Sequence, residues 1–310
     1  MSSRTGRKSL VVNYIAFAFS IIAWLPAQAS TCKPLGLDKD ALLQLKEQGY
    51  EIADADRRER FAIELVECLG DPDPQIRDDI AFEGFVTLLR GKQLRDDTVR
   101  TLLSGMTSQL NSDEDDQAGF RKPFLALSLA EVARADRIDE TFSAAERAAL
   151  VTDSTIYMRS ISDYRGFDVE EGWRHGVAHT ADLQMQLTLN SAVTQEQLVQ
   201  IRDSIATQVA PQGDHFYVYG ESGRLARPIL FMAARDAFTE EQWIDWFAGL
   251  ASADPYETWS DVFSSQAGLA KLHNTRAFAE AIYVSGVGSD TVGLQAVAAG
   301  ALELLKALPF

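Results

Sequence analysis

The chain has 310 residues, is 46% hydrophobic and carries a formal net charge of −16 at pH 7. Such an acidic surface repels nucleic-acid phosphates and anionic lipid headgroups, so no nucleic-acid partner is expected. The charge also suits cationic partners or metal ions, although the simpler interpretation is that it keeps the protein dispersed in solution.

Residues 1–29 have the pattern of a signal peptide. A basic start precedes a 16-residue apolar run from Leu10 to Leu25, and Ala27-Gln28-Ala29 follows as an A-x-A cleavage signature. Cleavage there would leave a mature chain that begins at Ser30 with a charge of −19, because the leader holds three basic residues and no acidic ones. The run is shorter than the roughly 20 residues that span a bilayer, and no other stretch could span one. We expect a periplasmic or secreted protein; a retained N-terminal anchor is the alternative.

Cys32 and Cys68 are the two cysteines, and both lie in the expected mature chain. Export would place them in a compartment where disulfides persist. A bond between them would stabilise the fold by about 4 kcal/mol in the loop-entropy model. We predict this disulfide; two buried free thiols are the alternative, because the sequence does not show whether their Cα atoms approach within bonding range.

Helical periodicity dominates the mature chain. Apolar residues recur every three or four positions over long stretches, as between Val99 and Leu110. Three capping boxes stand ahead of such stretches: Ser143-x-x-Glu146, Thr194-x-x-Gln197 and Thr239-x-x-Gln242. Asp254-Pro255 predicts a further start, with an N-cap followed by proline at the first helical position.

These signals predict an all-α protein in which residues 30–310 form a single helical domain. The expected helices span residues 39–49, 57–69, 75–90, 96–110, 118–134, 144–161, 171–189, 195–209, 222–236, 240–250, 256–270, 272–284 and 289–307. Only residues 215–219 look extended, and they are few enough to be a loop. Helices of this length with short connections form antiparallel pairs, and stacked pairs give a HEAT-like α/α superhelix. A compact multi-helix globule is the alternative.

The segment from Asp163 to Asp182 carries the candidate chemistry. On the predicted helix 171–189, His175, His179 and Asp182 share one narrow stripe. Two imidazoles one turn apart can bind a divalent metal such as zinc, with the carboxylate as third ligand or as an orienting partner. The zinc-protease motif is absent, because Gly176 replaces its glutamate. A polar pocket without metal, or hydrogen bonding to neighbouring acids, would explain the same residues.

Further polar and aromatic residues surround this stripe. In a catalytic interpretation, Asp168, Glu170 or Glu221 would activate a metal-bound water. The expected ligand-binding residues are Tyr164, Arg165, Trp173 and Arg224. A second group of polar residues lies near 214–224 and includes His215, Tyr217 and Tyr219. Simpler roles exist for some of these: Glu170 and Glu171 suit a helix N-terminus, and Arg224 could pair with Glu221 three residues earlier.

The phrase D-Y-R-G-F-D-V-E-E-G-W-R-H-G-V-A-H-T-A-D at 163–182, with Gly220-Glu221-x-x-Arg224-Leu225 downstream, resembles a bacterial family catalogued as domain of unknown function 2785. Similarity extends from about residue 70 to beyond 230. The resemblance implies a shared helical fold and a shared site, whose characteristic positions are Gly166, Glu170, Gly172, Trp173, His175, His179 and Asp182. The chain departs from the family's R-S-F-S pattern at residues 121–124. No activity comes with the family.

Two functions therefore remain open. One is a polar pocket around His175, His179 and Asp182 that binds a metal or a small ligand and, if catalytic, performs metal-assisted hydrolysis. The other is a protein-interaction scaffold of HEAT-like type with no catalytic site. A metal site requires the imidazole nitrogens to converge on a point about 2.1 Å away, whereas a scaffold should present a wide groove or an exposed apolar patch.

Overall fold

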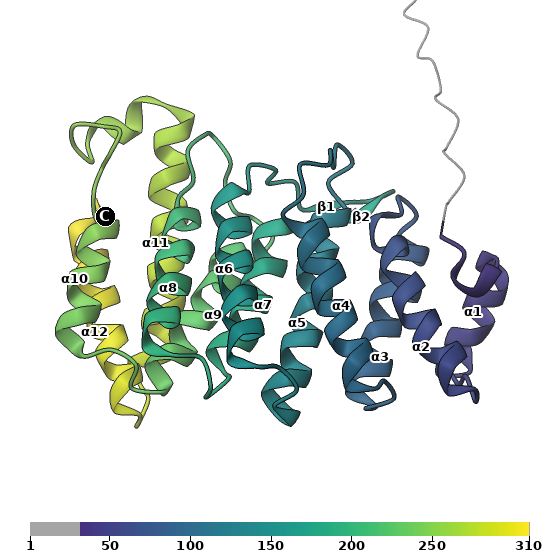
Figure 1. Ribbon diagram of the computed structural model, residues 1–310. Coiled ribbons are helices and arrows are strands. Elements are labelled where there is room, and N and C mark those ends of the chain that lie inside the picture. Colours follow the sequence, from purple (N-terminus) through teal and green to yellow (C-terminus); the bar gives the residue numbers. More distant parts are fainter. Residues whose placement is uncertain (1–31, 310) are drawn as a thin grey trace, which may run out of the picture.

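The computed structural model describes residues 32–309, and its architecture is a row of stacked helices (Figure 1). The expected signal peptide, residues 1–29, lies outside the described residues. The α-helices are α1 (Lys39–Glu47), α2 (Ala55–Glu64), α3 (Glu83–Arg90), α4 (Asp96–Leu110), α5 (Arg121–Asp139), α6 (Ala144–Ser160), α7 (Gly176–Thr188), α8 (Gln195–Val209), α9 (Glu221–Ala234), α10 (Glu240–Leu250), α11 (Gln266–Gly286) and α12 (Val292–Ala307). The short elements are 3-10 helices η1 (Pro34–Gly36), η2 (Leu65–Gly70) and η4 (Asp261–Ser264), the π-helix η3 (Gln75–Phe82), and strands β1 (Phe167–Asp168) and β2 (Gly172–Trp173).

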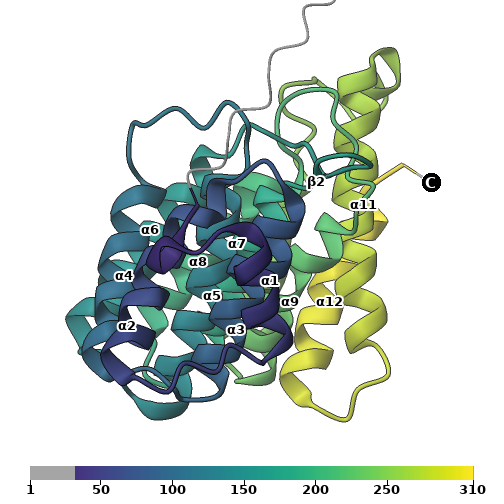
Figure 2. The same ribbon diagram turned by 90° about the vertical axis from the view of Figure 1, so that its right-hand side faces the viewer.

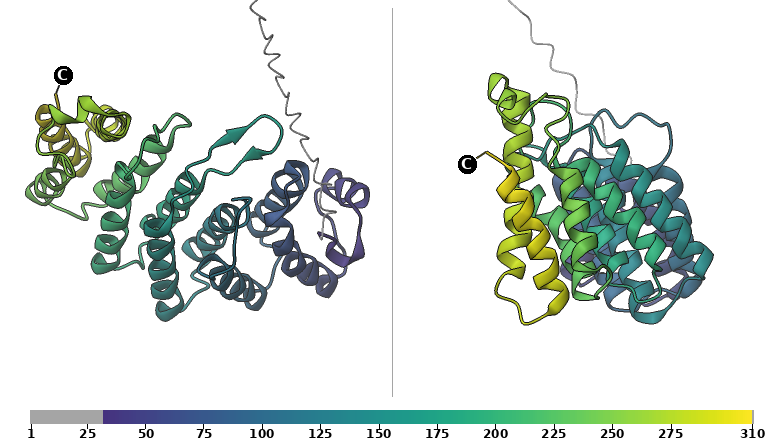
Figure 3. Two further views of the ribbon diagram at one scale, coloured as in Figure 1. Left: turned by 90° about the horizontal axis from the view of Figure 1, so that it is seen from above. Right: turned by 90° about the vertical axis from the view of Figure 1, so that its left-hand side faces the viewer.

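The helices form two layers, which confirms the predicted all-α stack of antiparallel pairs. In one layer α3 contacts α5, α5 contacts α7, and α7 contacts α9. In the other layer α2 contacts α4, α4 contacts α6, and α6 contacts α8. Seen from above the row is curved (Figure 3), and Figure 2 looks onto its N-terminal end. Each pair therefore packs mainly against its neighbours in sequence, as in HEAT-like solenoids.

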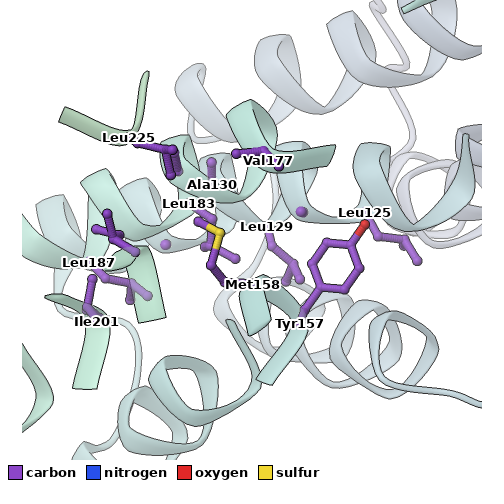
Figure 4. Close-up of a cluster of buried hydrophobic side chains, with 14 of the residues drawn as sticks. Leu125, Leu129, Ala130, Tyr157, Met158, Val177, Leu183, Leu187, Ile201 and Leu225 are labelled. Carbon is purple, nitrogen blue, oxygen red and sulfur yellow. The ribbon is translucent and has the colours of Figure 1, made fainter. Parts of the chain in front are cut away.

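Buried apolar side chains fill the space between the layers along the whole row, from Cys32 to Leu308. At the centre, Leu129 of α5, Met158 of α6 and Leu183 of α7 lie together, and Leu125 lies further along α5 beside Tyr157 (Figure 4). The leucine and methionine side chains are fully buried, and each such burial contributes about 1.5–3 kcal/mol. The central helices are thus rigidly packed beneath the segment that joins α6 to α7.

Local capping signals correctly predicted where three helices begin. The capping boxes at Ser143, Thr194 and Thr239 form with both reciprocal hydrogen bonds. Cys32 and Cys68 form a disulfide with their Cα atoms 4.8 Å apart, and it joins the start of the described chain to η2. Within residues 32–309, none of the helices combines the length and the apolar character needed to cross a membrane.

The predicted helix boundaries are wrong in two regions, 254–284 and 171–176. Asp254-Pro255 does not begin an α-helix. Residues 256–264 instead form turns followed by the short 3-10 helix η4. The Asp261 carboxylate stabilises the turn before η4 by accepting hydrogen bonds from both the amide and the hydroxyl of Thr258. Ser265 then caps α11, a single helix in place of the two predicted over 256–284. The predicted helix 171–189 begins only at Gly176, because the preceding residues form a hairpin.

Candidate functional site

A β-hairpin between α6 and α7 replaces the expected helix start. Phe167 pairs with Trp173, and Asp168 pairs with Gly172. The Asp168 carboxylate closes the turn by accepting from the amides of Glu170 and Glu171, at 2.8 and 2.9 Å, and these bonds lower its pKa. Asp168 is thereby a turn-forming residue as well as a candidate ligand contact.

Two arginines hold this hairpin against the N-terminal part of the stack. Arg77 is completely buried between the rings of Phe120 and Phe124, and its Nη2 donates to the Glu171 carbonyl at 2.8 Å. The Arg174 guanidinium also lies over the Phe120 ring, and it donates to the Glu171 carboxylate at 2.7 Å. Glu171 therefore anchors the hairpin, and its expected role at a helix N-terminus is wrong.

Left-handed backbone conformations explain why the helix could not start earlier. Gly172 has φ +76°, and its neighbour Arg77 Nη2 would lie only 3.0 Å from a Cβ at this position. His175 has φ 59° and is the N-cap residue of α7. A right-handed helix cannot continue through such residues. As a consequence, His175 precedes the helix that carries His179 and Asp182, and the expected single stripe is not formed.

The two histidines nevertheless lie together in the interior. Their ring centroids are 5.7 Å apart, and both side chains are at least nine-tenths buried. Burial, assisted by the positive charge of Arg224, lowers the pKa of His175 to about 4. Burial also lowers the pKa of His179 well below its usual value. Both imidazoles are therefore neutral at pH 7, and His175 Nε2 and His179 Nδ1 have no hydrogen-bond partner within residues 32–309.

Asp182 and Glu221 have different partners from those expected. Arg224 forms a two-point ion pair with the Asp182 carboxylate, one bond being 2.9 Å from Nε, and Arg227 lies 3.7 Å away. The expected pairing of Arg224 with Glu221 is wrong. Burial raises the pKa of Asp182, and Arg224 partly offsets this effect. Glu221, 2% exposed, accepts from the Tyr219 amide at 2.9 Å, and its other oxygen lies 3.7 Å from His175 Nε2.

A pocket of about 500 Å³ opens between the hairpin and the loop that leads to α9. Its lining residues are Tyr164, Arg165, Gly166, Phe167, Asp168, Glu171, Arg174, His215 and Tyr219. Tyr164, Arg165 and Asp168 of the predicted site residues line it directly. Trp173 lies beside it, with its ring centroid 5.0 Å from that of Phe167 and 5.8 Å from that of Tyr219. Glu170 is exposed in the hairpin turn and does not line the pocket.

His175 and Glu221 lie behind this pocket, in a narrow space that Tyr164 and Arg165 also border. The ring of Trp173 stacks on that of His175 at 4.8 Å, with an angle of 20° between the planes. The buried polar groups thus position the aromatic residues beside the pocket. His175 packs against the ring of Trp173, and Glu221 accepts a hydrogen bond from the backbone of Tyr219. The sequence pattern identified these groups but not their supporting role.

The charged groups of the pocket are mostly paired. Burial alone would raise the pKa of Asp163, but hydrogen bonds from Arg165 lower it overall. Tyr164 stacks on His215 with ring centroids 5.4 Å apart. Phe167 was not among the expected site residues, whereas Gly166 was one of the characteristic positions that the family resemblance implied. The structure gives the steric reason for glycine at this position, because a Cβ there would lie 2.0 Å from the Tyr219 ring.

A metal centre was one prediction for these residues. Among residues 32–309, no group of three or more His, Cys, Asp or Glu side chains is arranged to hold a metal ion. The Asp182 carboxylate is paired with the guanidinium groups of Arg224 and Arg227. It is therefore not available as the third metal ligand that was expected beside His175 and His179.

The fold and site together define a HEAT-like helical solenoid with an inserted hairpin and a pocket beside it. The family model described as "Protein of unknown function (DUF2785)" matches residues 106–284, more than half of the chain, and the protein belongs to this family. The match covers the hairpin, α7 and the loop before α9, and it begins later than the resemblance had suggested. No curated protein and no solved structure matches the chain.

Proposed function

We propose that this protein is an exported binding protein whose hairpin pocket holds a small, polar, ring-bearing ligand. The observation that carries the proposal is the convergence of aromatic rings and charged groups on one pocket of about 500 Å³. These groups come from two segments, 164–174 and 215–219, which the buried Arg77, His175 and Glu221 hold in place. Pockets of this size with a few placed polar groups are typical of small-molecule sites.

The pocket offers two kinds of contact. Phe167 and Tyr219 present ring faces or edges, against which a flat ring or the apolar face of a sugar can pack. Asp168 and Arg165 present a carboxylate and a guanidinium at the margin, which suit hydroxyl, amide or acidic substituents. Binding is favoured over catalysis because the Trp173 ring stacks on His175, the imidazole whose Nε2 lies 3.7 Å from the buried Glu221 carboxylate.

A thermal-shift comparison tests this proposal. Purified mature protein is melted with a panel of monosaccharides, nucleosides and aromatic acids, beside Tyr219→Ala and the matched control Tyr283→Ala on α11. We expect at least one compound to raise the Tm of the wild type and of Tyr283→Ala but not of Tyr219→Ala. Shifts that are equal in all three proteins, or absent throughout a panel of these classes, would contradict a hairpin-pocket site.

Export is supported by the leader pattern and by the Cys32–Cys68 disulfide, which suits an oxidising compartment. N-terminal sequencing of protein from the periplasmic fraction should give Ser30 as the first residue. Recovery of the uncleaved chain in the membrane fraction would support the retained anchor instead.

A divalent metal is the second candidate ligand, and the unpartnered nitrogens of His175 and His179 are the observation that favours it. The Glu221 carboxylate lies 3.7 Å from His175 Nε2, but it does not form a three-ligand site with the two histidines as they stand, so a bound metal would have to reposition these side chains. Metal content of the purified protein beside His175→Ala tests this role. Equal and negligible metal in both would exclude it.

A protein partner is the third candidate, because exposed apolar side chains surround the pocket. Val169 is 87% exposed at the hairpin turn, and Val218 is 68% exposed in the facing loop. Val169→Ser should weaken capture of a protein partner and leave a small ligand in the pocket unaffected. The protein-interaction scaffold would be favoured if Val169→Ser no longer co-purifies with a protein that the wild type retains. The affinity for a small ligand should then be equal in the two proteins.

A further inference from the structure

A second pocket, of about 520 Å³, lies between the loop after α8 and the loop before α11. It is lined by residues around 210–213, by Asp254, Pro255 and Tyr256, and by Lys271 on the second turn of α11. It shares no lining residue with the hairpin pocket. Lys271 and Asp254 are its charged groups.

Lys271 differs from the other lysines in its surroundings. Residues 32–309 contain seven lysines, and five have an oxygen partner: Lys39, Lys46, Lys92, Lys122 and Lys306. Lys33 is exposed to water. Lys271 is half-buried, and within the described part of the chain its ammonium has no hydrogen bond or ion pair; Nζ lies 5.6 Å from the ring centroid of Trp259.

The neighbouring acid does not neutralise this lysine. Asp254 raises the pKa of Lys271 through its charge, but burial lowers it more, so the pKa lies below its usual value. One oxygen of Asp254 accepts from the Ser252 hydroxyl at 2.7 Å. Within residues 32–309 the half-buried Lys271 ammonium therefore has no carboxylate in direct contact, and a ligand carboxylate would supply one.

We propose that this pocket binds a small organic carboxylate, whose charged group pairs with the Lys271 ammonium. One cation suits one carboxylate, whereas a phosphate group with two charges needs more donors than this lining offers. Tyr256 lines the pocket and provides aromatic surface for the rest of the molecule. The site is independent of the hairpin pocket and of the function proposed for it.

Binding should be linked to protonation. A bound carboxylate stabilises the ammonium form, so the pKa of Lys271 rises when the site is filled. Affinity should therefore fall as the pH rises through the lowered pKa of the free site.

Calorimetric titration with benzoate on the mature protein tests the site, with uncharged benzamide of the same shape as the second ligand. Four proteins are compared: wild type, Lys271→Met, Lys271→Arg and the control Lys306→Met. We expect benzoate to bind wild type, Lys271→Arg and Lys306→Met, to bind Lys271→Met about tenfold more weakly or worse, and benzamide to bind none of them detectably.

Three results would overturn the proposal. Equal benzoate affinity in wild type and a folded Lys271→Met would remove Lys271 from the site. Binding of benzamide as tight as that of benzoate would show that charge is not recognised. Inorganic phosphate that displaces benzoate at lower concentration would reassign the pocket to inorganic anions. An unchanged Tm of Lys271→Met shows that a loss of binding is not caused by misfolding, and binding by Lys271→Arg shows that the cation is what the site requires.

Discussion

Burial sets the protonation state of His175 and makes stability depend on pH. Its pKa is about 4 in the folded protein, against about 6.5 in an unfolded chain. Between these values the unfolded chain binds a proton that the folded protein does not bind, so stability falls as the pH is lowered from 6.5 to 4. This single imidazole can account for a loss of up to about 3 kcal/mol.

Urea unfolding of metal-free protein at pH 7 and pH 4.5, with chelator present, measures this effect. We expect His175→Gln to lose less stability than the wild type over this interval. The exposed His273→Gln should behave like the wild type. An identical pH dependence in wild type and His175→Gln would show that His175 is not the group responsible.

Gly166 makes a purely steric contribution to the pocket. The would-be Cβ lies 2.0 Å from the Tyr219 ring, so Gly166→Ala must displace either the hairpin or the facing loop. Overpacking of this kind costs about 1–3 kcal/mol. Gly105→Ala on α4, where nothing lies within 4 Å, should instead stabilise the helix by about 0.5–1 kcal/mol. Denaturant midpoints of the two variants should therefore move in opposite directions.

At the scale of the element, the hairpin depends on an anchor that lies far from it in sequence. Arg77 and Glu171 are 94 residues apart, and their hydrogen bond crosses from η3 to the hairpin turn. Arg77→Met keeps an apolar side chain at this position but removes the guanidinium that lies over Phe120 and Phe124. This bond is lost with it, as are those to the Asp71 carbonyl and the Asp78 carboxylate. Amide hydrogen exchange in residues 166–174 should then accelerate. Arg90→Met, which breaks a pair with Glu131, should leave the hairpin unchanged.

How well the sequence predicted each element follows from the range of the interactions that form it. Capping boxes are complete within four residues, so the starts of α6, α8 and α10 could be predicted. The hairpin could not be predicted, because the left-handed backbone at Gly172 and His175 and the contact of the hairpin turn with Arg77 depend on the folded chain and not on local spacing. The candidate site follows the same rule. Local spacing was enough to single out His175 and His179, but the pairing of Asp182 with Arg224 could not be predicted because these residues are 42 apart in the sequence.

At the scale of the whole molecule, stability should be distributed along the row. Each helix pair contacts mainly its neighbours, so a local defect is expected to spread only a short distance. The Cys32–Cys68 disulfide joins residues 36 apart at the N-terminal end, where α1 contacts little beyond η3. The disulfide therefore holds the N-terminal segment against η2 at the end of the solenoid.

Replacing both cysteines by serine should release this end. The loop-entropy model gives a loss of about 3–4 kcal/mol for a loop of this length, and we expect it mainly in α1, α2 and η2. Hydrogen exchange of wild type and Cys32→Ser/Cys68→Ser should show faster exchange up to about residue 70 and unchanged protection in α9 to α12. Uniformly faster exchange along the chain would instead show that the helical row unfolds as one cooperative unit, and the description as nearly independent neighbouring pairs would then fail.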